Sequence, residues 1–238
     1  GIICNALFIA YQITKIKKAK EMIISASNFV QKDLNISYEG KNLCFSYSPF
    51  DNQKVFNASM KAARLLSQTY YFNDDSKLIT AIRNVINFVI NHQNDDGSWY
   101  YSLANKGNWV DNYHTGYIID CIDEYQKISG DYSFKDNIEK GYKYYSNNFF
   151  TKNFIPKFYN NKLYPIDCSS AAQSIMTLVR FSDEKNALKV ASWMIKNMRK
   201  FDGSFIFRRH KYYKQKTSYM RWSNAWMFAA LSYLRSKI

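Results

Sequence analysis

The sequence has little of what usually interrupts helices. Among its 238 residues are only 3 Pro and 8 Gly, and this scarcity favours a mostly helical protein. No apolar run reaches the roughly 18 residues of a membrane-spanning helix, so we expect no membrane span. The stretch from Gly1 to Tyr11 is apolar but lacks a basic leader and an export cleavage site. We therefore predict a cytoplasmic protein, and the helical start without Met indicates that upstream sequence is missing.

Paired or clustered cysteines are also lacking. None of the four, Cys4, Cys44, Cys121 and Cys168, has a C-x-x-C partner or lies in a Cys/His cluster. We expect free thiols in a reducing compartment, with neither a metal nor another cofactor.

Positive charge and aromatic side chains are abundant. Lys and Arg number 33 against 19 Asp and Glu, and there are 20 Tyr and 17 Phe. A net charge of +14 attracts polyanions such as nucleic acid, anionic lipid or an acidic polysaccharide. The alternative is that part of this charge reflects only a general compositional bias toward Lys and Asn.

An internal repeat organises the chain. Similar small, apolar helical patterns begin at Asn57, His114, Ser170 and Asn224, with offsets of 57, 56 and 54 residues. After a short turn, each of the first three is followed by a more polar helical pattern, over about 77–92, 132–149 and 184–198. The first helix of each pair reads as an inner helix and the second as an outer one. Residues 4–7 look like the remnant of an earlier inner helix.

Repeated helix pairs predict an all-α fold. We expect a single α/α-toroid domain over residues 1–238, in which helix hairpins close into a ring, and an open solenoid of helix pairs is the alternative. Long aromatic loops, over 36–50, 94–109, 151–166 and 202–219, would then share one rim. Loops on a rigid scaffold are where binding groups usually lie.

A turn motif occurs at Gln93-Asn94-Asp95-Asp96-Gly97-Ser98-Trp99, and residues 201–205 echo it. It resembles the Gln-x-x-Asp-Gly-x-Trp repeat of terpenoid cyclases and several glycan-processing toroids. In those families the repeat mainly ties helix ends together, so a structural role is the first interpretation. Asp96 and Trp99 are retained as candidate substrate contacts.

The segment from Trp109 to Tyr117 holds the main catalytic candidates. Asp111 and His114 lie one helical turn apart, and an Asp beside a His can orient the imidazole as a general acid or base. The alternative is that Asp111 caps the helix while His114 is buried in the core. Neighbouring side chains suited to packing against or hydrogen bonding to sugar rings are Trp109, Asn112, Tyr113 and Tyr117.

Further carboxylates occur at related positions. Asp167 lies 56 residues after Asp111, and Asp51 lies 60 residues before it. Three carboxylates on one rim could include the acid/base pair that sugar chemistry needs, although Asp167 could simply cap a helix. Accompanying candidates for substrate binding are Asn57, Tyr164 and Gln173.

The last repeat brings a cation. Arg221 could clamp a substrate carboxylate, and Trp222, four residues before Trp226, would share a helical face with it. A surface Arg and two packing tryptophans are the alternative. The basic run 208–211, interleaved with Tyr212 and Tyr213, could grip an anionic chain or be a solvated loop.

Four blocks carry a family resemblance. Residues 45–51, 95–99, 109–116 and 165–167 resemble a bacterial α/α-toroid family similar to the C-terminal domains of glucuronyl C5-epimerases and to related polysaccharide-processing six-hairpin enzymes. The resemblance implies an (α/α)6 barrel, whereas four and a half hairpins can be counted, so an incomplete barrel truncated at the N-terminus is expected. It also implies a base beside a uronate carboxylate and a stabilising cation, and His114, Tyr113 and Arg221 fit these roles.

These observations predict a carbohydrate-active protein of surface-polysaccharide metabolism. It would act on an anionic, uronate-containing glycan by epimerisation, elimination or hydrolysis, with Asp111, Tyr113, His114 and Asp167 as catalytic residues. A non-catalytic glycan-binding or scaffold toroid is the first alternative. A terpenoid-cyclase-like enzyme is the second, although the chain lacks its Asp-x-Asp-Asp motif. Nucleic acid is not the expected partner.

Overall fold

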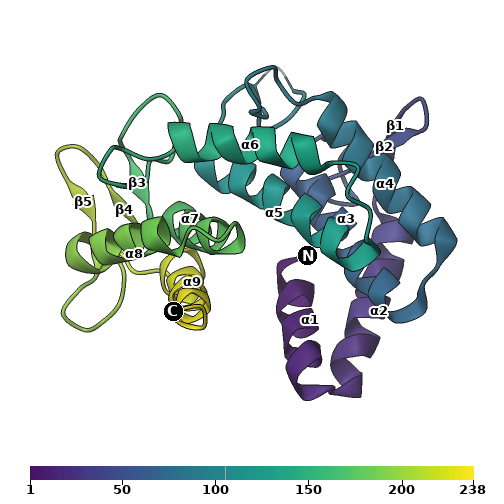
Figure 1. The fold of residues 1–238 in the computed structure, drawn as a ribbon, viewed down its shortest axis with the longest axis horizontal. Helices are drawn as coiled ribbons and strands as arrows, with labels where there is room; N and C mark the ends of the chain where they lie inside the picture. The colour runs from purple at the N-terminus through teal and green to yellow at the C-terminus, as the bar shows by residue number, and fades with distance from the viewer. Residues whose placement is uncertain (105) are drawn as a thin grey trace. The chain divides into compact units, whose positions relative to one another are not determined.

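The computed structural model describes residues 1–104 and 106–238, and its secondary structure is mainly helical (Figure 1). The helices are α1 (Ile2–Thr14), α2 (Lys17–Asp33), α3 (Phe56–Asn73), α4 (Ser76–Asn91), α5 (Asn112–Ser129), α6 (Lys135–Asn148), α7 (Cys168–Arg180), α8 (Glu184–Met198) and α9 (Trp226–Arg235), with a π-helix (Met220–Ala225) leading into α9. Short strands are β1 (Ile36–Glu39), β2 (Asn42–Phe45), β3 (Ile166–Asp167), β4 (Arg208–Arg209) and β5 (Lys214–Gln215). The predicted all-α class is confirmed.

The helices follow the repeat. Neighbouring helices pack as pairs, α1 with α2, α3 with α4, and α7 with α8, while α9 packs against α7. In the described residues the count of four and a half pairs therefore agrees with the sequence. The segment at residues 4–7 lies in α1, which with α2 forms a complete hairpin rather than a remnant.

The chain divides into two compact units. Unit 1 contains residues 1–108 and 118–141, and unit 2 contains residues 109–117 and 142–238. Helices α5 and α6 contribute residues to both units. Each unit is described by itself below.

Unit 1 has its core around α3. This helix is buried on most sides, including polar positions such as Ser67 and Gln68. The side-chain NH₂ group of Gln68 donates hydrogen bonds to Asn5 and Glu124, both at 2.8 Å. By contrast, α4 buries one face, with Leu78, Ile82, Val85, Ile86 and Val89 repeating at helical spacing. The predicted inner and outer patterns are both observed in this pair.

Unit 2 repeats this arrangement with α7 and α8. Helix α7 is buried from Cys168 to Val179 almost without interruption, whereas α8 buries only the face carrying Val190 and Met194. Asp183 caps α8 by accepting a hydrogen bond from the backbone N–H of Asn186.

Strands occupy parts of the long loops. β1 and β2 form an antiparallel hairpin within 36–50, and β3, β4 and β5 form a three-stranded sheet in that order. In the first sheet Ile36 lies opposite Phe45, and in the second Asp167 lies opposite Arg208. These pairings position side chains that the sequence placed in unstructured loops.

None of the helices in the described residues combines the length and apolarity that crossing a bilayer requires.

Candidate functional site

The Asp111 carboxylate and the His114 imidazole are in direct contact in unit 2. Asp111 Oδ1 accepts the backbone N–H of His114 at 2.9 Å, and Oδ2 lies 2.6 Å from His114 Nδ1. The Asp111 side chain is fully buried, whereas 24% of the His114 side chain is exposed. The carboxylate therefore orients the ring, and the ring is the part that solvent can reach.

Aromatic side chains surround this pair. Trp109 Nε1 donates a hydrogen bond to Asp111 Oδ2 at 2.9 Å, and Trp109 is 37% exposed. The Tyr113 ring meets the His114 ring edge-on at 5.2 Å and the Trp226 ring edge-on at 5.5 Å. Of the predicted neighbours, Tyr113 therefore contacts the imidazole and Trp109 contacts its carboxylate partner. Trp226, which the sequence did not assign to the site, packs against Tyr113.

Asn112 fixes the beginning of α5 through hydrogen bonds of its side chain. Its side chain donates to the backbone oxygen of Lys157 at 3.0 Å, and its Oδ1 accepts from the hydroxyls of Tyr145 at 2.6 Å and Ser174 at 3.0 Å. Asn112 is completely buried. These contacts assign it to holding the α5 terminus against α7, with no surface left for a substrate.

Asp167 pairs with a cation. Its Oδ1 accepts from the Ser170 backbone N–H at 3.0 Å and thereby caps α7, while its Oδ2 accepts Arg208 Nε at 2.6 Å. The Asp167 side chain is almost fully buried, and about a third of the Arg208 side chain is exposed. The sequence identified Asp167 but not its partner, because the pairing joins two strands of two residues each.

The segment around Phe158 connects the two pairs. The Asn112 backbone N–H donates to the Phe158 oxygen at 2.9 Å, and Asp111 forms a backbone bridge with Tyr159. The Arg208 guanidinium lies 5.4 Å from the Phe158 ring centre. The beginnings of α5 and α7 thus meet at this segment, as the rim prediction requires within unit 2.

The π-helix places Arg221 and Trp222 differently from the expectation. Both are exposed, and the Trp222 ring contacts Phe207 and Tyr219 rather than the surroundings of Trp226. A π-helix has a wider turn than an α-helix, so side chains four residues apart are not aligned there. The two tryptophans do not share the predicted face.

The remaining candidates in unit 2 are mainly internal. Tyr117 is 3% exposed and Gln173 is 2% exposed, and Gln173 donates to Thr177 Oγ1 at 3.0 Å. Tyr164 is half-buried and precedes Pro165 in a cis peptide bond. These positions favour packing roles for Tyr117 and Gln173.

Asp51 and Asn57 belong to unit 1. Asp51 accepts hydrogen bonds from the Ser48 hydroxyl and from the backbone of Gln53 and Tyr47, which shape the loop before α3. The Ser48 hydroxyl and then the Gln53 N–H lower the pKa of Asp51. Asn57 is 2% exposed, and its Oδ1 accepts no hydrogen bond from the residues that the structure describes. Since these residues lie in unit 1, their relation to Asp111 stays a prediction.

The Asp96–Gly97–Ser98–Trp99 turn is built into the core of unit 1. Asp96 Oδ1 accepts the Ser98 backbone N–H at 2.9 Å, and Trp99 Nε1 donates to the Val89 oxygen at 2.9 Å. Trp99 is 1% exposed. The indole has no face available for a sugar ring, which favours the structural interpretation of this motif.

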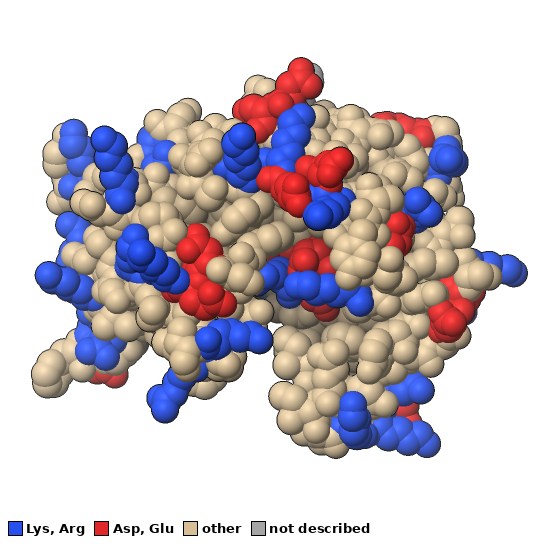
Figure 2. Space-filling view, in the orientation of Figure 1, with Lys and Arg blue, Asp and Glu red and all other residues tan. Residues whose placement is uncertain are grey.

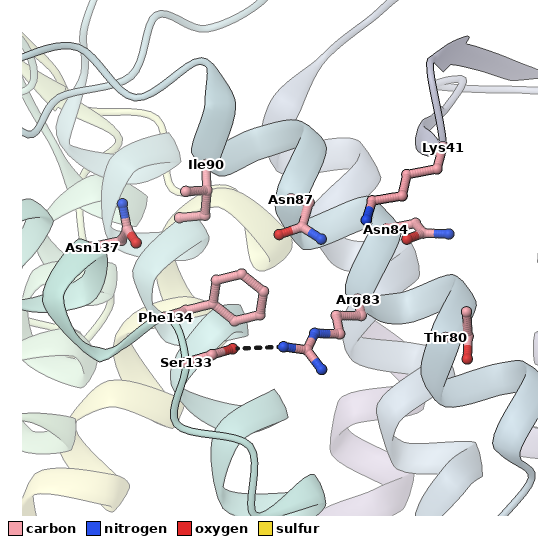
Figure 3. A pocket seen from close by; sticks show the side chains of 9 residues that line it. All are labelled: Lys41, Thr80, Arg83, Asn84, Asn87, Ile90, Ser133, Phe134 and Asn137. Carbon is pink, nitrogen blue, oxygen red and sulfur yellow. Dashed lines mark hydrogen bonds between the residues drawn. The ribbon is translucent and has the colours of Figure 1, made fainter.

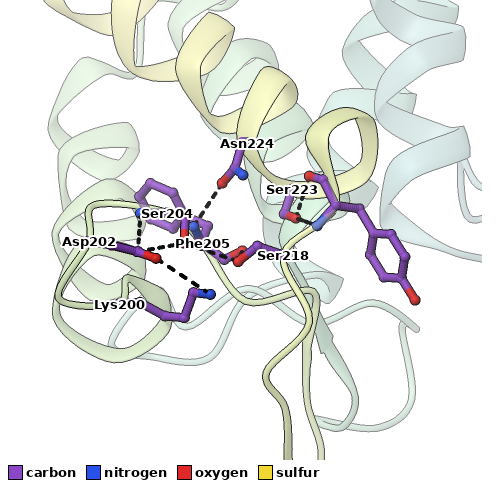
Figure 4. A network of polar contacts seen from close by, with 8 residues as sticks. Lys200, Asp202, Ser204, Phe205, Ser218, Ser223 and Asn224 are labelled. Carbon is purple, nitrogen blue, oxygen red and sulfur yellow. Dashed lines mark hydrogen bonds and ion pairs between the residues drawn. The ribbon is translucent and has the colours of Figure 1, made fainter.

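The echo of the motif ties a loop of unit 2 to the π-helix (Figure 4). Asp202 accepts from the backbone N–H and hydroxyl of Ser204, and the Phe205 backbone N–H donates to Asn224 Oδ1 at 2.8 Å. The Ser218 hydroxyl donates to the Phe205 oxygen at 2.8 Å. Both copies of the turn therefore connect helix ends.

A cavity of about 780 Å³ lies elsewhere, on the outer side of α4 in unit 1 (Figure 3). Figure 3 shows Arg83 pointing toward Ser133, with Phe134 between Arg83 and Asn137. Its lining consists of Lys41, Thr80, Arg83, Asn84, Asn87, Ile90, Ser133, Phe134 and Asn137. None of the predicted site residues lines this cavity.

Metal-binding geometry is not found in the described part of the chain, where no group of three or more His, Cys, Asp or Glu side chains is arranged to hold an ion. All four cysteines are buried and free. Burial raises the pKa of Cys44 to about 11 and that of Cys121 to about 12. These thiols are therefore poor nucleophiles at neutral pH.

No family model and no curated protein sequence matches the chain. Solved structures do resemble it. Cellobiose 2-epimerase from Bacillus thermoamylovorans B4167 has a TM-score of 0.75 at 12% identity, covering 98% of this chain and 70% of that one. Unsaturated glucuronyl hydrolase from Bacillus sp. GL1 has a TM-score of 0.72 at 10% identity, covering 97% and 72%. A family 105 glycoside hydrolase from C. acetobutylicum ATCC 824 has a TM-score of 0.72 at 9% identity, covering 99% and 78%. At these identities the likeness shows the fold alone, and that fold is the α/α toroid.

Proposed function

We propose that the chain is a carbohydrate-active enzyme that transfers a proton next to the carboxylate of a uronate residue in an anionic glycan. The solved structures of similar fold include a cellobiose 2-epimerase, a D-mannose isomerase and an unsaturated glucuronyl hydrolase. Proteins of this fold therefore include epimerases, isomerases and hydrolases of sugars. Because the sequence identities are low, the choice among these reactions has to be argued from the side chains of the site.

The contact between Asp111 and His114 carries the proposal. A carboxylate that accepts the Nδ1–H of an imidazole leaves the lone pair of the neutral ring on Nε2, where it can receive a proton. At 2.6 Å the carboxylate also stabilises the imidazolium that forms. His114 is thus proposed as the general base, and Asp111 as the residue that positions it.

The same geometry argues against hydrolysis by a pair of carboxylates. A glycosidase needs two carboxyl groups that flank the glycosidic bond and touch the substrate. Asp111 and Asp167 are 0% and 3% exposed, and both oxygens of each side chain already accept hydrogen bonds. Neither is available to protonate a leaving group or to attack a sugar carbon.

The reaction begins when His114 takes the proton from the carbon beside the uronate carboxylate. The electron pair of the broken C–H bond moves into the carboxylate and gives an enolate, which a cation must stabilise. We assign this role to Arg208, whose guanidinium has five N–H donors, of which Nε serves Asp167. Arg221 is the second candidate.

Two outcomes follow from this enolate. Return of a proton to the opposite face completes an epimerisation, and Tyr113, whose ring contacts His114, is the candidate donor. Loss of the neighbouring glycosidic oxygen completes an elimination and leaves a double bond in the product. Both outcomes share the same first proton transfer.

Solvent deuterium tests the shared step. Uronate oligosaccharides are incubated with the protein in D₂O, and deuterium in intact and in cleaved material is followed by mass spectrometry. We expect the wild type either to incorporate deuterium, if it epimerises, or to form an unsaturated product, if it eliminates. In His114→Ala the rate of either reaction should fall about 10²–10⁴-fold, with glycan binding retained. His92→Gln, a change in unit 1, is the control for loss of a histidine and should retain the activity.

Three results would overturn the proposal. Glycan binding by the wild type with neither deuterium incorporation nor an unsaturated product would indicate the non-catalytic scaffold. Cleavage with neither deuterium in the uronate nor a double bond in the product would indicate hydrolysis. Equal incorporation by His114→Ala and wild type would remove His114 from the reaction.

A further inference from the structure

The positive charge of the chain is concentrated near its C-terminus. Residues 185–238 contain thirteen Lys or Arg and a single acid, Asp202, so twelve of the fourteen net positive charges lie there. Asp202 is itself paired with Lys200 at 3.7 Å. All of these residues belong to unit 2. On the face shown in Figure 2, basic side chains are spread widely and acidic ones form a few small groups.

Part of this charge lies along the outer face of α8. Lys189, Trp193 and Lys196 are spaced four and three residues apart, so they form one helical stripe. A depression of about 410 Å³ follows this stripe and is lined by Asn153, Leu188, Lys189, Ser192, Trp193 and Lys196. The lining combines cations, an indole ring, an amide and a hydroxyl.

The β4–β5 hairpin adds two further cations to the stripe, one from each strand. Successive side chains of a strand point to opposite faces, and here Arg208 reaches Asp167 while Arg209 lies on the α8 side. The Arg209 guanidinium lies 5.7 Å from the Trp193 ring centre and donates to Asn197 Oδ1 at 3.3 Å. Lys214, opposite Arg209 in the sheet, donates to the Asn197 oxygen at 3.4 Å. Both cations are held by neutral groups, which fix their positions without cancelling their charge.

The turn of this hairpin presents aromatic rings beside more cations. Tyr212 and Tyr213 are 86% and 62% exposed. The Tyr213 ring stacks on the His210 ring at 4.3 Å, and Lys211 lies 5.0 Å from the centre of the Tyr212 ring. The turn thus places two exposed rings beside cations, next to the strands that carry Arg209 and Lys214.

We propose that unit 2 carries a second, non-catalytic site for an anionic polysaccharide, formed by Lys189, Trp193 and Lys196 of α8 with Arg209 and Lys214 of the β4–β5 hairpin. The cations suit carboxylate or sulfate groups, and the indole suits the apolar face of a pyranose ring. The amide and hydroxyl of the depression suit sugar hydroxyls. This choice of a glycan rests on the proposed function, because β4 joins the stripe to the Asp167–Arg208 pair.

Paired charge reversals test the site. Labelled oligogalacturonate is titrated against the full chain by fluorescence polarisation, with labelled oligo(dT) and a neutral dextran oligosaccharide in parallel. Lys189→Glu/Lys196→Glu is expected to weaken oligogalacturonate binding about tenfold and to flatten its dependence on salt. The control, Lys17→Glu/Lys77→Glu, changes the net charge equally at exposed positions of unit 1 and should bind within about twofold of the wild type.

The possible results separate the two proposals. Unchanged oligogalacturonate binding in the α8 variant, or an equal loss in the control, would overturn the second site. Tighter binding of oligo(dT) than of oligogalacturonate, lost in the same variant, would overturn it in favour of a nucleic-acid surface. If the α8 variant loses oligogalacturonate binding while the wild type gives neither deuterium incorporation nor an unsaturated product, the second site is supported and the catalytic proposal is rejected. Turnover of a uronate disaccharide by the α8 variant is expected to equal that of the wild type.

Discussion

Asp111→Asn is the most informative change in the site, because it keeps the side-chain shape and removes the charge. An amide oxygen in the place of Oδ1 still accepts the His114 backbone N–H, now 2.9 Å away. An NH₂ group in the place of Oδ2 faces two donors, Trp109 Nε1 at 2.9 Å and His114 Nδ1 at 2.6 Å. The helix cap survives, but the hydrogen-bond pattern around the imidazole reverses.

This reversal selects the wrong tautomer of His114. To accept a hydrogen bond from the new NH₂ group, the neutral ring must present its lone pair on Nδ1 and carry its proton on Nε2. It can then no longer take a proton from a substrate at Nε2. The same exchange in the Ser-His-Asp triad lowers the rate about 10⁴-fold, so we expect the rate of deuterium incorporation to fall about 10³–10⁴-fold.

The stability cost is expected to be small. Trp109 loses its acceptor, but at 37% exposure water can replace it, and a net hydrogen bond contributes about 0.5–1.5 kcal/mol. Asn and Asp are nearly equal as caps. An overall loss of about 1–2 kcal/mol would lower Tm by roughly 2–8 °C for a chain of this length. The variant should therefore be folded and bind glycan while being almost inactive.

The assay combines deuterium incorporation, glycan titration and thermal unfolding. Asp75→Asn is the matched control, because Asp75 caps α4 by accepting the Lys77 N–H at 2.9 Å. It changes charge and cap chemistry in the same way in unit 1, and its activity should equal that of the wild type. Near-normal incorporation by a folded Asp111→Asn protein, or an equal loss in Asp75→Asn, would refute the tautomer argument.

Two further predictions concern stability. Gly97 and Gly203 occupy equivalent Asp-Gly turns with φ of +95° and +86°. An added Cβ at Gly97 would lie 2.5 Å from the Lys140 backbone oxygen, whereas one at Gly203 would meet no atom of the described residues within 4 Å. Gly203→Ala should cost about 1–2 kcal/mol and Gly97→Ala about 2 kcal/mol more, and equal costs in urea unfolding would contradict the packing of this motif. Burial raises the pKa of Cys44 from 9.0 to about 11, so the unfolded chain loses this proton first and stability present below about pH 9 is lost as the pH rises toward 11. Between pH 8 and pH 10.5, the free energy of unfolding measured in urea should fall by about 2 kcal/mol less in Cys44→Ala than in the wild type. The same fall in both proteins would indicate an accessible thiol.

The helices could be predicted because burial repeats along the sequence. Each inner helix must bury most of its surface, so small and apolar residues recur near 57, 114, 170 and 224. Each outer helix buries one face only, as α4 and α8 do. Both constraints are local to a helix and therefore leave a periodic pattern. Predicted and observed boundaries differ by a few residues, mainly where caps rather than burial decide them.

The loops could not be predicted in the same way. A strand of two residues, such as β3 or β4, is too short to show alternation. Its pairing partner lies far along the chain, as Arg208 does from Asp167. The π-helix is likewise invisible in a pattern, and it separates Trp222 from the surroundings of Trp226. Arg208, the cation of the proposed site, was missed because the strand that carries it is too short to be recognised in the sequence.

At Asp111 and Asp167 the structural and functional interpretations are compatible. In each carboxylate Oδ1 caps the inner helix that follows, and Oδ2 contacts a second side chain, His114 in one case and Arg208 in the other. A cap needs only one oxygen, so the second is available to orient a base or hold a cation. The corresponding position of the last repeat is Arg221, which has no carboxylate to offer and is exposed. The repeat therefore supplies an oriented imidazole and a fixed guanidinium at two successive helix beginnings of unit 2, and the proposed proton transfer beside a carboxylate relies on this combination.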